Sequence, residues 1–182
     1  MTRLVSRGVA LLLLAGLLPG CALFSDDPRV RTPGTMIDDQ VIETMVKRQI
    51  WGSDPAFDSS HLVAVSYNGV LLLAGEVETA DLRRRAGEIA RSFDKVRRVH
   101  NEIEVGGPIS MLARANDAWL TTKVKSRMLV DAEVAARKIK VVTQNGTVYL
   151  MGMLPREQAD RAAQAARSVY GVQKIVKVFE YI

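Results

Sequence analysis

Residues 116–129 bring an aromatic ring, aliphatic side chains and several cations together at helical spacing. At about 100° per residue, Leu120, Val124 and Met128 fall within roughly 80° of one another, which is typical of a helix face that packs into a core. Trp119 points away from that face and lies beside Lys123. An indole next to cations on the solvent side of a helix suits an anionic membrane interface, where the ring occupies the boundary and the cations meet headgroups.

The first twenty residues have the form of a signal peptide. Arg3 and Arg7 give a positive start, and residues 9–18 form an apolar run that is too short to be a stable membrane span. We therefore expect residues 1–20 to direct export and to be removed.

The apolar run ends in Leu18-Pro19-Gly20-Cys21, which resembles the lipobox of bacterial lipoproteins. The resemblance implies that the mature chain begins at a lipidated, palmitate-bearing Cys21 and is anchored to a membrane rather than spanning it. In that family Ala22, which is not Asp, implies the periplasmic face of the outer membrane. Cys21 is the single cysteine, so no internal disulfide can form. The alternative interpretation is an ordinary buried thiol.

Charge divides unevenly along the chain. Residues 21–106 hold 11 Lys and Arg against 14 Asp and Glu, a net charge of −3, whereas residues 107–182 hold 12 against 6, a net charge of +6. The basic second part fits an anionic lipid or a nucleic acid. Because export makes nucleic acid the poorer choice, none is expected as a partner.

Residues 21–36 are expected to form a tether, of which residues 22–36 reach at most about 50 Å when fully extended. Beyond the tether, an internal repeat organises the chain. The repeat predicts modules at residues 37–106 and 107–182, joined by the short segment 106–109, so the two modules should touch. The core positions agree between the copies, since Ile42, Val46 and Ile50 align with Leu120, Val124 and Met128. The neighbouring positions differ, since Val41 and Met45 align with Trp119 and Lys123.

Each copy predicts the element order α-β-β-α-β. Asn68-Gly69 and Asn145-Gly146 separate apolar runs and indicate hairpins, because both residue types tolerate positive φ. The expected fold is α+β, with two helices packed on one face of a three-stranded mixed sheet in each module. The expected helices are residues 37–50, 80–93, 117–129 and 156–169, with Asp38 or Asp39 and Asn116 or Asp117 as N-caps. The expected strands are residues 62–67, 70–73, 96–105, 139–143, 147–150 and 172–181.

Several of these residues carry a family resemblance. The first helix, the Asn-Gly hairpin, Gly75 and Gly152 after the second strand, and the closing strand of each copy resemble BON domains, most specifically in residues 116–124 and 145–152. Two such modules behind a lipobox resemble the outer-membrane lipoproteins with two BON domains.

The resemblance implies that the first helix of the second module binds anionic phospholipid, either phosphatidylglycerol or cardiolipin, and that the protein supports outer-membrane integrity at the division site and under envelope stress. Trp119 and Leu129 fall on matching family positions and are the leading apolar contacts. The full set of expected phospholipid-binding residues is Trp119, Leu120, Lys123, Lys125, Arg127 and Leu129.

Two alternatives stay open. Trp119 can instead pack against the first module or cover a sheet edge. The same face can also dock another envelope protein, such as the outer-membrane assembly machinery or a regulator of peptidoglycan hydrolysis. His61 and His100 each stand alone, and the Ser and Asp residues show no nucleophile elbow or triad. We therefore expect no enzyme, no metal and no cofactor.

Overall fold

The structure is a computed structural model and describes residues 31–182. The predicted signal peptide, the lipidation site Cys21 and most of the tether lie outside the described residues. Residues Pro33–Ile182 form one compact unit that contains both copies of the repeat.

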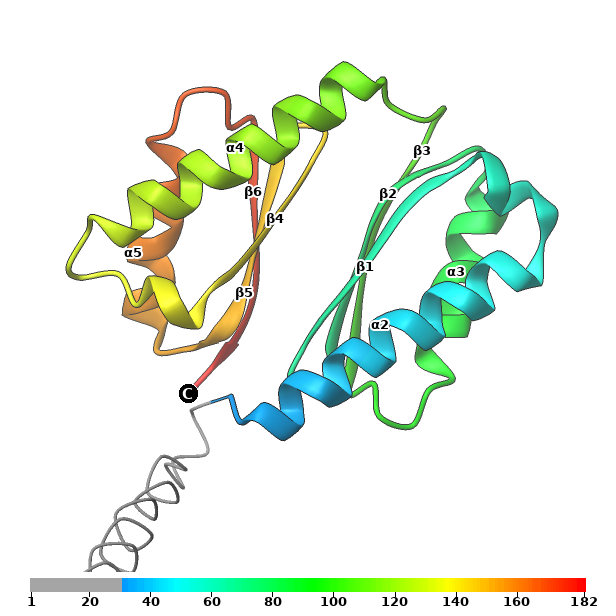
Figure 1. The fold of residues 1–182 in the computed structure, drawn as a ribbon, viewed down its shortest axis with the longest axis horizontal. Coiled ribbons are helices and arrows are strands. Elements are labelled where there is room, and N and C mark those ends of the chain that lie inside the picture. The colour runs from blue at the N-terminus through cyan, green and yellow to red at the C-terminus, as the bar shows by residue number, and fades with distance from the viewer. Residues whose placement is uncertain (1–30) are drawn as a thin grey trace, which may run out of the picture. The chain divides into compact units, whose positions relative to one another are not determined.

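Each copy has the predicted element order, as Figure 1 shows. The first sheet has the strand order β1-β2-β3 and the second the order β4-β5-β6, with an antiparallel hairpin followed by a parallel pair in both. The α+β prediction with three-stranded mixed sheets is confirmed. The first module consists of α2 (Pro33–Ser53), the 3₁₀ helix η2 (Pro55–Ser59), β1 (His61–Tyr67), β2 (Val70–Val77), α3 (Ala80–Arg91) and β3 (Arg98–Val105). The second consists of α4 (Met111–Leu129), η3 (Ala136–Lys138), β4 (Lys140–Gln144), β5 (Thr147–Leu154), α5 (Arg156–Arg167) and β6 (Lys174–Tyr181).

The two first helices begin earlier than the sequence pattern predicts. Helix α2 begins at Pro33, four residues before the expected start, so residues 33–36 belong to the helix and not to the predicted tether. Proline suits a first helical position because the N–H that it lacks would have no partner there. Helix α4 begins at Met111 instead of residue 117, and the Ser110 side chain caps it by accepting the Ala113 N–H at 3.2 Å. The added turns have exposed apolar residues, so they lack the amphipathic period of a packed helix.

The middle strands are buried on both faces. Leu71 and Leu73 of β2 point into the core under α2 and α3, whereas Leu72 and Ala74 point to the other side of the sheet. A strand covered on both faces reads as a continuous apolar run, as β2 does from Val70 onward.

The two sheets pack against each other through their helix-free faces. Val65 and Leu72 of the first sheet share a buried cluster with Tyr149 and Met151 of the second. Polar contacts also join the modules, among them an ion pair of 2.8 Å between Lys140 Nζ and Glu43 Oε1. The prediction that the modules touch is therefore confirmed.

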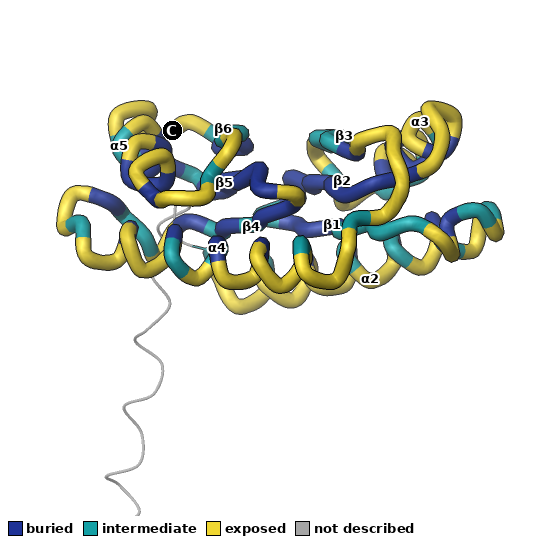
Figure 2. The backbone as a smooth tube through the Cα atoms, turned by 90° about the horizontal axis from the view of Figure 1, so that it is seen from above, coloured by how far each residue is buried: buried dark blue, intermediate teal, exposed yellow. Residues whose placement is uncertain are grey.

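This packing leaves α2, α3, α4 and α5 on the outside of the two sheets. In Figure 2, α2 and α4 lie along the lower side of the unit, where much of the tube is coloured as exposed, and α3 and α5 lie at the upper side. The first helix of each module thus belongs to a common layer.

Candidate lipid-binding surface

Helix α4 packs on the second sheet through the side that the sequence assigns to the core. Leu120, Val124 and Met128 are buried in one cluster with residues of β4, β5 and α5. Leu120 is only 1% exposed, so the prediction that it contacts phospholipid is wrong. It lies one residue, or about 100°, from Trp119, and that rotation is enough to turn its side chain into the core.

The opposite side of α4 carries Trp119, which is 57% exposed. The Lys123 ammonium lies 3.8 Å from the centroid of the indole ring, a cation–π contact one helical turn away. The ring is open to solvent, neither sealed between the modules nor buried at a sheet edge, and its neighbour is a cation.

Further apolar residues continue this exposed side toward both ends of the helix. Leu129 is 63% exposed, and Val130 beside it is also exposed. Met111 and Leu112 are exposed on the first turn, which the sequence prediction did not assign to the helix. The sequence feature that could have indicated this turn is Ser110. It lies three residues before Ala113, which is the spacing between an N-cap side chain and the N–H that it accepts.

Exposed cations accompany these residues. Lys125 is exposed, and Arg127 lies 4.0 Å from the Asp131 carboxylate across the end of the helix. We call this set the α4 outer face. It consists of Met111, Leu112, Trp119, Lys123, Lys125, Arg127, Leu129 and Val130.

A hollow of about 350 Å³ adjoins the α4 outer face at Leu129. It lies over the loop after α4, and its lining includes Val134 and three alanines together with the exposed cations Arg137 and Lys138. These two cations belong to η3 and were not among the predicted site residues. No helical period signals them, because they follow a loop.

An aspartate in α4 fixes the helix to the sheet beneath it. Asp117 is buried, and its carboxylate accepts the N–H groups of Asn145 at 2.8 Å and Gly146 at 2.9 Å from the tip of the β4–β5 hairpin. A second bond of 2.7 Å joins the hydroxyls of Thr121 and Thr143. The outer face is therefore presented by a helix whose rotation is set by the core and by these bonds.

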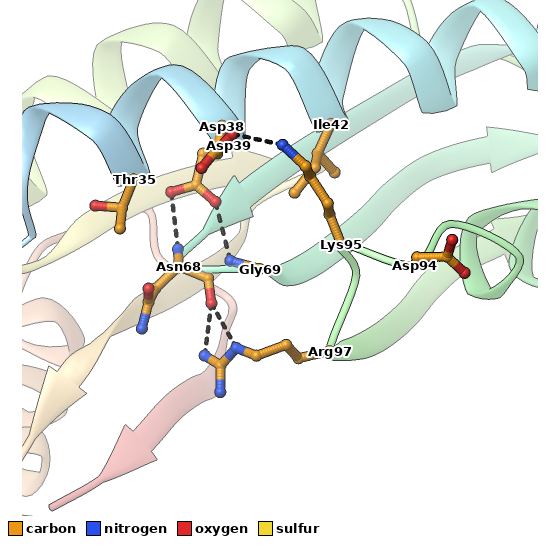
Figure 3. Close-up of a pocket in the computed structure, with 9 residues that line it drawn as sticks. All are labelled: Thr35, Asp38, Asp39, Ile42, Asn68, Gly69, Asp94, Lys95 and Arg97. Atoms are coloured by element: carbon orange, nitrogen blue, oxygen red, sulfur yellow. Dashed lines mark hydrogen bonds and ion pairs between the residues drawn. The ribbon is translucent and has the colours of Figure 1, made fainter.

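The first module has the same arrangement. The Asp39 carboxylate accepts the N–H groups of Asn68 and Gly69, as Figure 3 shows, and also the Ser66 hydroxyl. The prediction that Asp39 or Asp117 caps a helix is wrong. Each lies well inside its helix and instead ties that helix to the hairpin about 29 residues later.

Among residues 31–182, no group of three His, Cys, Asp or Glu residues is placed to hold a metal ion. Across the same residues, no helix combines the length and apolar character that crossing a bilayer requires.

Two modules of this topology, with an Asn-Gly hairpin under the first helix of each, define the class of protein. The BON domain family matches residues 38–107 and 116–182, and the chain belongs to that family.

Relatives of known name share most of the chain. The outer membrane lipoprotein DolP of Haemophilus influenzae is 40% identical over 161 residues, which cover 88% of this chain and 82% of that protein. A 21 kDa hemolysin of Actinobacillus pleuropneumoniae is 38% identical, covering 86% of this chain and 79% of the relative. The osmotically inducible protein Y of Escherichia coli is 28% identical, covering 82% and 75%.

Proposed function

We propose that this chain is a non-enzymatic outer-membrane lipoprotein, anchored through Cys21, that binds anionic phospholipid through the α4 outer face. The similarity to an outer membrane lipoprotein over most of both chains supports the location. Phosphatidylglycerol and cardiolipin are the lipids expected, and support of the outer membrane at the division site is the role that the proposal assigns.

The observation that carries the proposal is Trp119, exposed and stacked with Lys123 on a helix whose other side fills the core. An exposed tryptophan costs solubility unless it has a partner, and a bilayer interface accommodates both the ring and the adjacent ammonium group. Near an anionic surface each cation contributes on the order of 1 kcal/mol.

Weak binding by one helix is sufficient for this role. A lipid chain on Cys21 would keep the protein at the membrane, so that headgroup binding becomes an intramolecular event at high effective concentration. The outer face then decides where on the membrane, and in which orientation, the folded unit settles.

The test uses residues 21–182 with Cys21→Ser and vesicles of phosphatidylethanolamine with or without phosphatidylglycerol. Binding to the anionic vesicles should fall with rising salt, and Trp119→Glu should weaken it by roughly tenfold or more. The matched control is Tyr170→Glu, which changes an aromatic side chain that is 90% exposed between α5 and β6, outside the set of residues named as the α4 outer face, and should leave binding intact.

Unchanged binding of a folded Trp119→Glu protein would refute the proposal. Crosslinking from position 119 in cell envelopes addresses the other candidate. Crosslinks to a single envelope protein, with no affinity for vesicles, would assign the α4 outer face to protein docking instead.

A further inference from the structure

Helix α2 of the first module has an exposed apolar stripe of its own. Ile37 is 66% exposed and Met45 is 55% exposed, with exposed Val41 between them. The spacing of four residues places all three on one side of the helix, and exposed Met36 adjoins them. Ile42 and Val46 on the other side are buried in the core.

The stripe occupies the position in the first module that Trp119 and Lys123 occupy in the second, since Val41 and Met45 align with them. Figure 2 shows α2 and α4 in one layer on the lower side of the unit. Because Val41 and Met45 hold the positions on α2 that Trp119 and Lys123 hold on α4, we expect a flat surface along this layer to face both sets of side chains.

The carboxylates of α2 do not oppose an anionic surface as free charges. Asp39 is buried against the hairpin, Asp38 is paired with Lys95 at 2.8 Å, and Glu43 is paired with Lys140 at 2.8 Å. Arg48, seven residues after Val41, lies on the same side of the helix as the stripe and is exposed.

The short length of chain before α2 favours the lipid bilayer as the partner that covers the stripe. Only twelve residues separate the start of the helix from the end of the predicted signal peptide, and Cys21 is the first of them. Fully extended, they span about 40 Å. A lipid chain on Cys21 would thus keep the first turns of α2 within that distance of the bilayer surface.

From these observations we infer that Met36, Ile37, Val41 and Met45 form a second, apolar contact with the same lipid bilayer. The inference depends on the proposed function. The α4 outer face and Arg48 supply charge-dependent contacts, whereas the four apolar side chains on α2 supply a contact that salt leaves unchanged. The two together hold both modules flat on the membrane.

The first test measures affinity. In residues 21–182 with Cys21→Ser, Val41→Asp and Met45→Asp should each weaken binding to phosphatidylglycerol-containing vesicles by roughly tenfold. Gln164→Asp introduces the same charge at an exposed position of α5 and should leave binding unchanged.

The second test locates the contact. The chain with Cys21→Ser has no other cysteine, so a single cysteine at a chosen position accepts one environment-sensitive fluorophore. The positions are Val41→Cys on α2, Ser126→Cys at an exposed position of α4 between Lys125 and Arg127, and Arg167→Cys at the end of α5. Brominated acyl chains should quench the label at positions 41 and 126 but not at 167.

The outcomes separate the inference from the function on which it depends. Quenching at 126 alone, with full affinity in Val41→Asp, overturns the second contact and leaves the proposed function standing. No quenching at 126, with unchanged affinity in Trp119→Glu, overturns both. The inference is also overturned if the label at position 41 is shielded from solvent without vesicles, in a dimer that sedimentation velocity detects and that Val41→Asp abolishes. That result would assign the stripe to contact with a second copy of the chain.

Discussion

The Asp117 carboxylate and the Gly146 N–H are joined by a hydrogen bond of 2.9 Å, and Asp39 and Gly69 repeat the bond at 3.0 Å in the first module. Both glycines have positive φ, as do Asn68 and Asn145 before them. The tight turn points two successive N–H groups at one carboxylate, and the helix above each hairpin is fixed by that pairing.

Asp117→Ala should therefore destabilise the protein strongly. It leaves the N–H groups of Asn145 and Gly146 without their acceptor under a helix, and each such loss costs about 1–3 kcal/mol. We expect the free energy of unfolding in urea to fall by about 2–4 kcal/mol. The control is Asn116→Ala, at the exposed neighbouring position, which should change it by less than about 0.5 kcal/mol. Equal effects of the two substitutions would contradict the role of Asp117.

The cations at the C-terminal end of α4 should contribute strongly to the affinity for anionic lipid. Replacing Lys125 and Arg127 together by Gln removes two charges worth on the order of 1 kcal/mol each, so affinity for anionic vesicles should fall roughly 30-fold. Arg167→Gln with Lys174→Gln makes the same change in net charge at exposed positions on α5 and β6. If both double variants bind equally weakly, net charge and not the α4 outer face determines affinity.

Local patterns predict most of the elements because their causes are local. The Asn-Gly turns require positive φ at consecutive residues, and the apolar positions Ile42, Val46 and Ile50 repeat at helical spacing over a single core. The strands predicted at residues 70–73 and 147–150 continue to Val77 and Leu154 in the structure, because both faces of each strand stay covered to its end.

Tertiary contacts explain what the pattern did not predict. Asp39 and Asp117 look like caps because short acceptors favour helix starts, but their partners lie 28–30 residues away. Only the recurrence of the same Asp-to-hairpin separation in both copies could have indicated the bond. The exposure of Trp119 agrees with its sequence prediction, and lipid contact at the outer face stays a prediction.

Two glycines should be intolerant of a side chain because backbone lies against them. A Cβ at Gly75 would come 1.9 Å from the His61 carbonyl oxygen, and a Cβ at Gly152 would come 2.6 Å from that of Lys138. Gly75→Ala and Gly152→Ala should therefore each lower the melting temperature by several degrees, as expected for a displaced strand. Gly52→Ala is the matched control. It lies in α2 with open space around it, and alanine should stabilise the helix by up to about 1 kcal/mol. A melting temperature unchanged by Gly75→Ala would show that the two strands can separate there without cost.

Glu76 should make the folded protein less stable as pH rises. It is 5% exposed at the end of β2, and burial followed by the nearby Glu104 raises its pKa above 4.5, an effect that the Ile109 N–H partly offsets. The charge of Asp117 in α4 also raises the pKa of Glu76, whereas that of Arg114 lowers it. His61 Nδ1 of β1 lies 4.0 Å from Glu76 Oε2.

Because the folded protein holds this proton more tightly than the unfolded chain does, its contribution to stability is present below pH 4.5 and is lost as pH rises through the raised pKa. Glu76→Gln keeps an acceptor for the Ile109 N–H and carries no charge, so it should melt higher than the parent at pH 7.5, by about 2–4 °C for each kcal/mol recovered. At pH 4 the difference should vanish. Asp94→Asn makes the same change in net charge at an exposed position and should show no such pH dependence. A parent and Glu76→Gln protein whose melting temperatures differ equally at both pH values would mean that the carboxylate is not strained by burial.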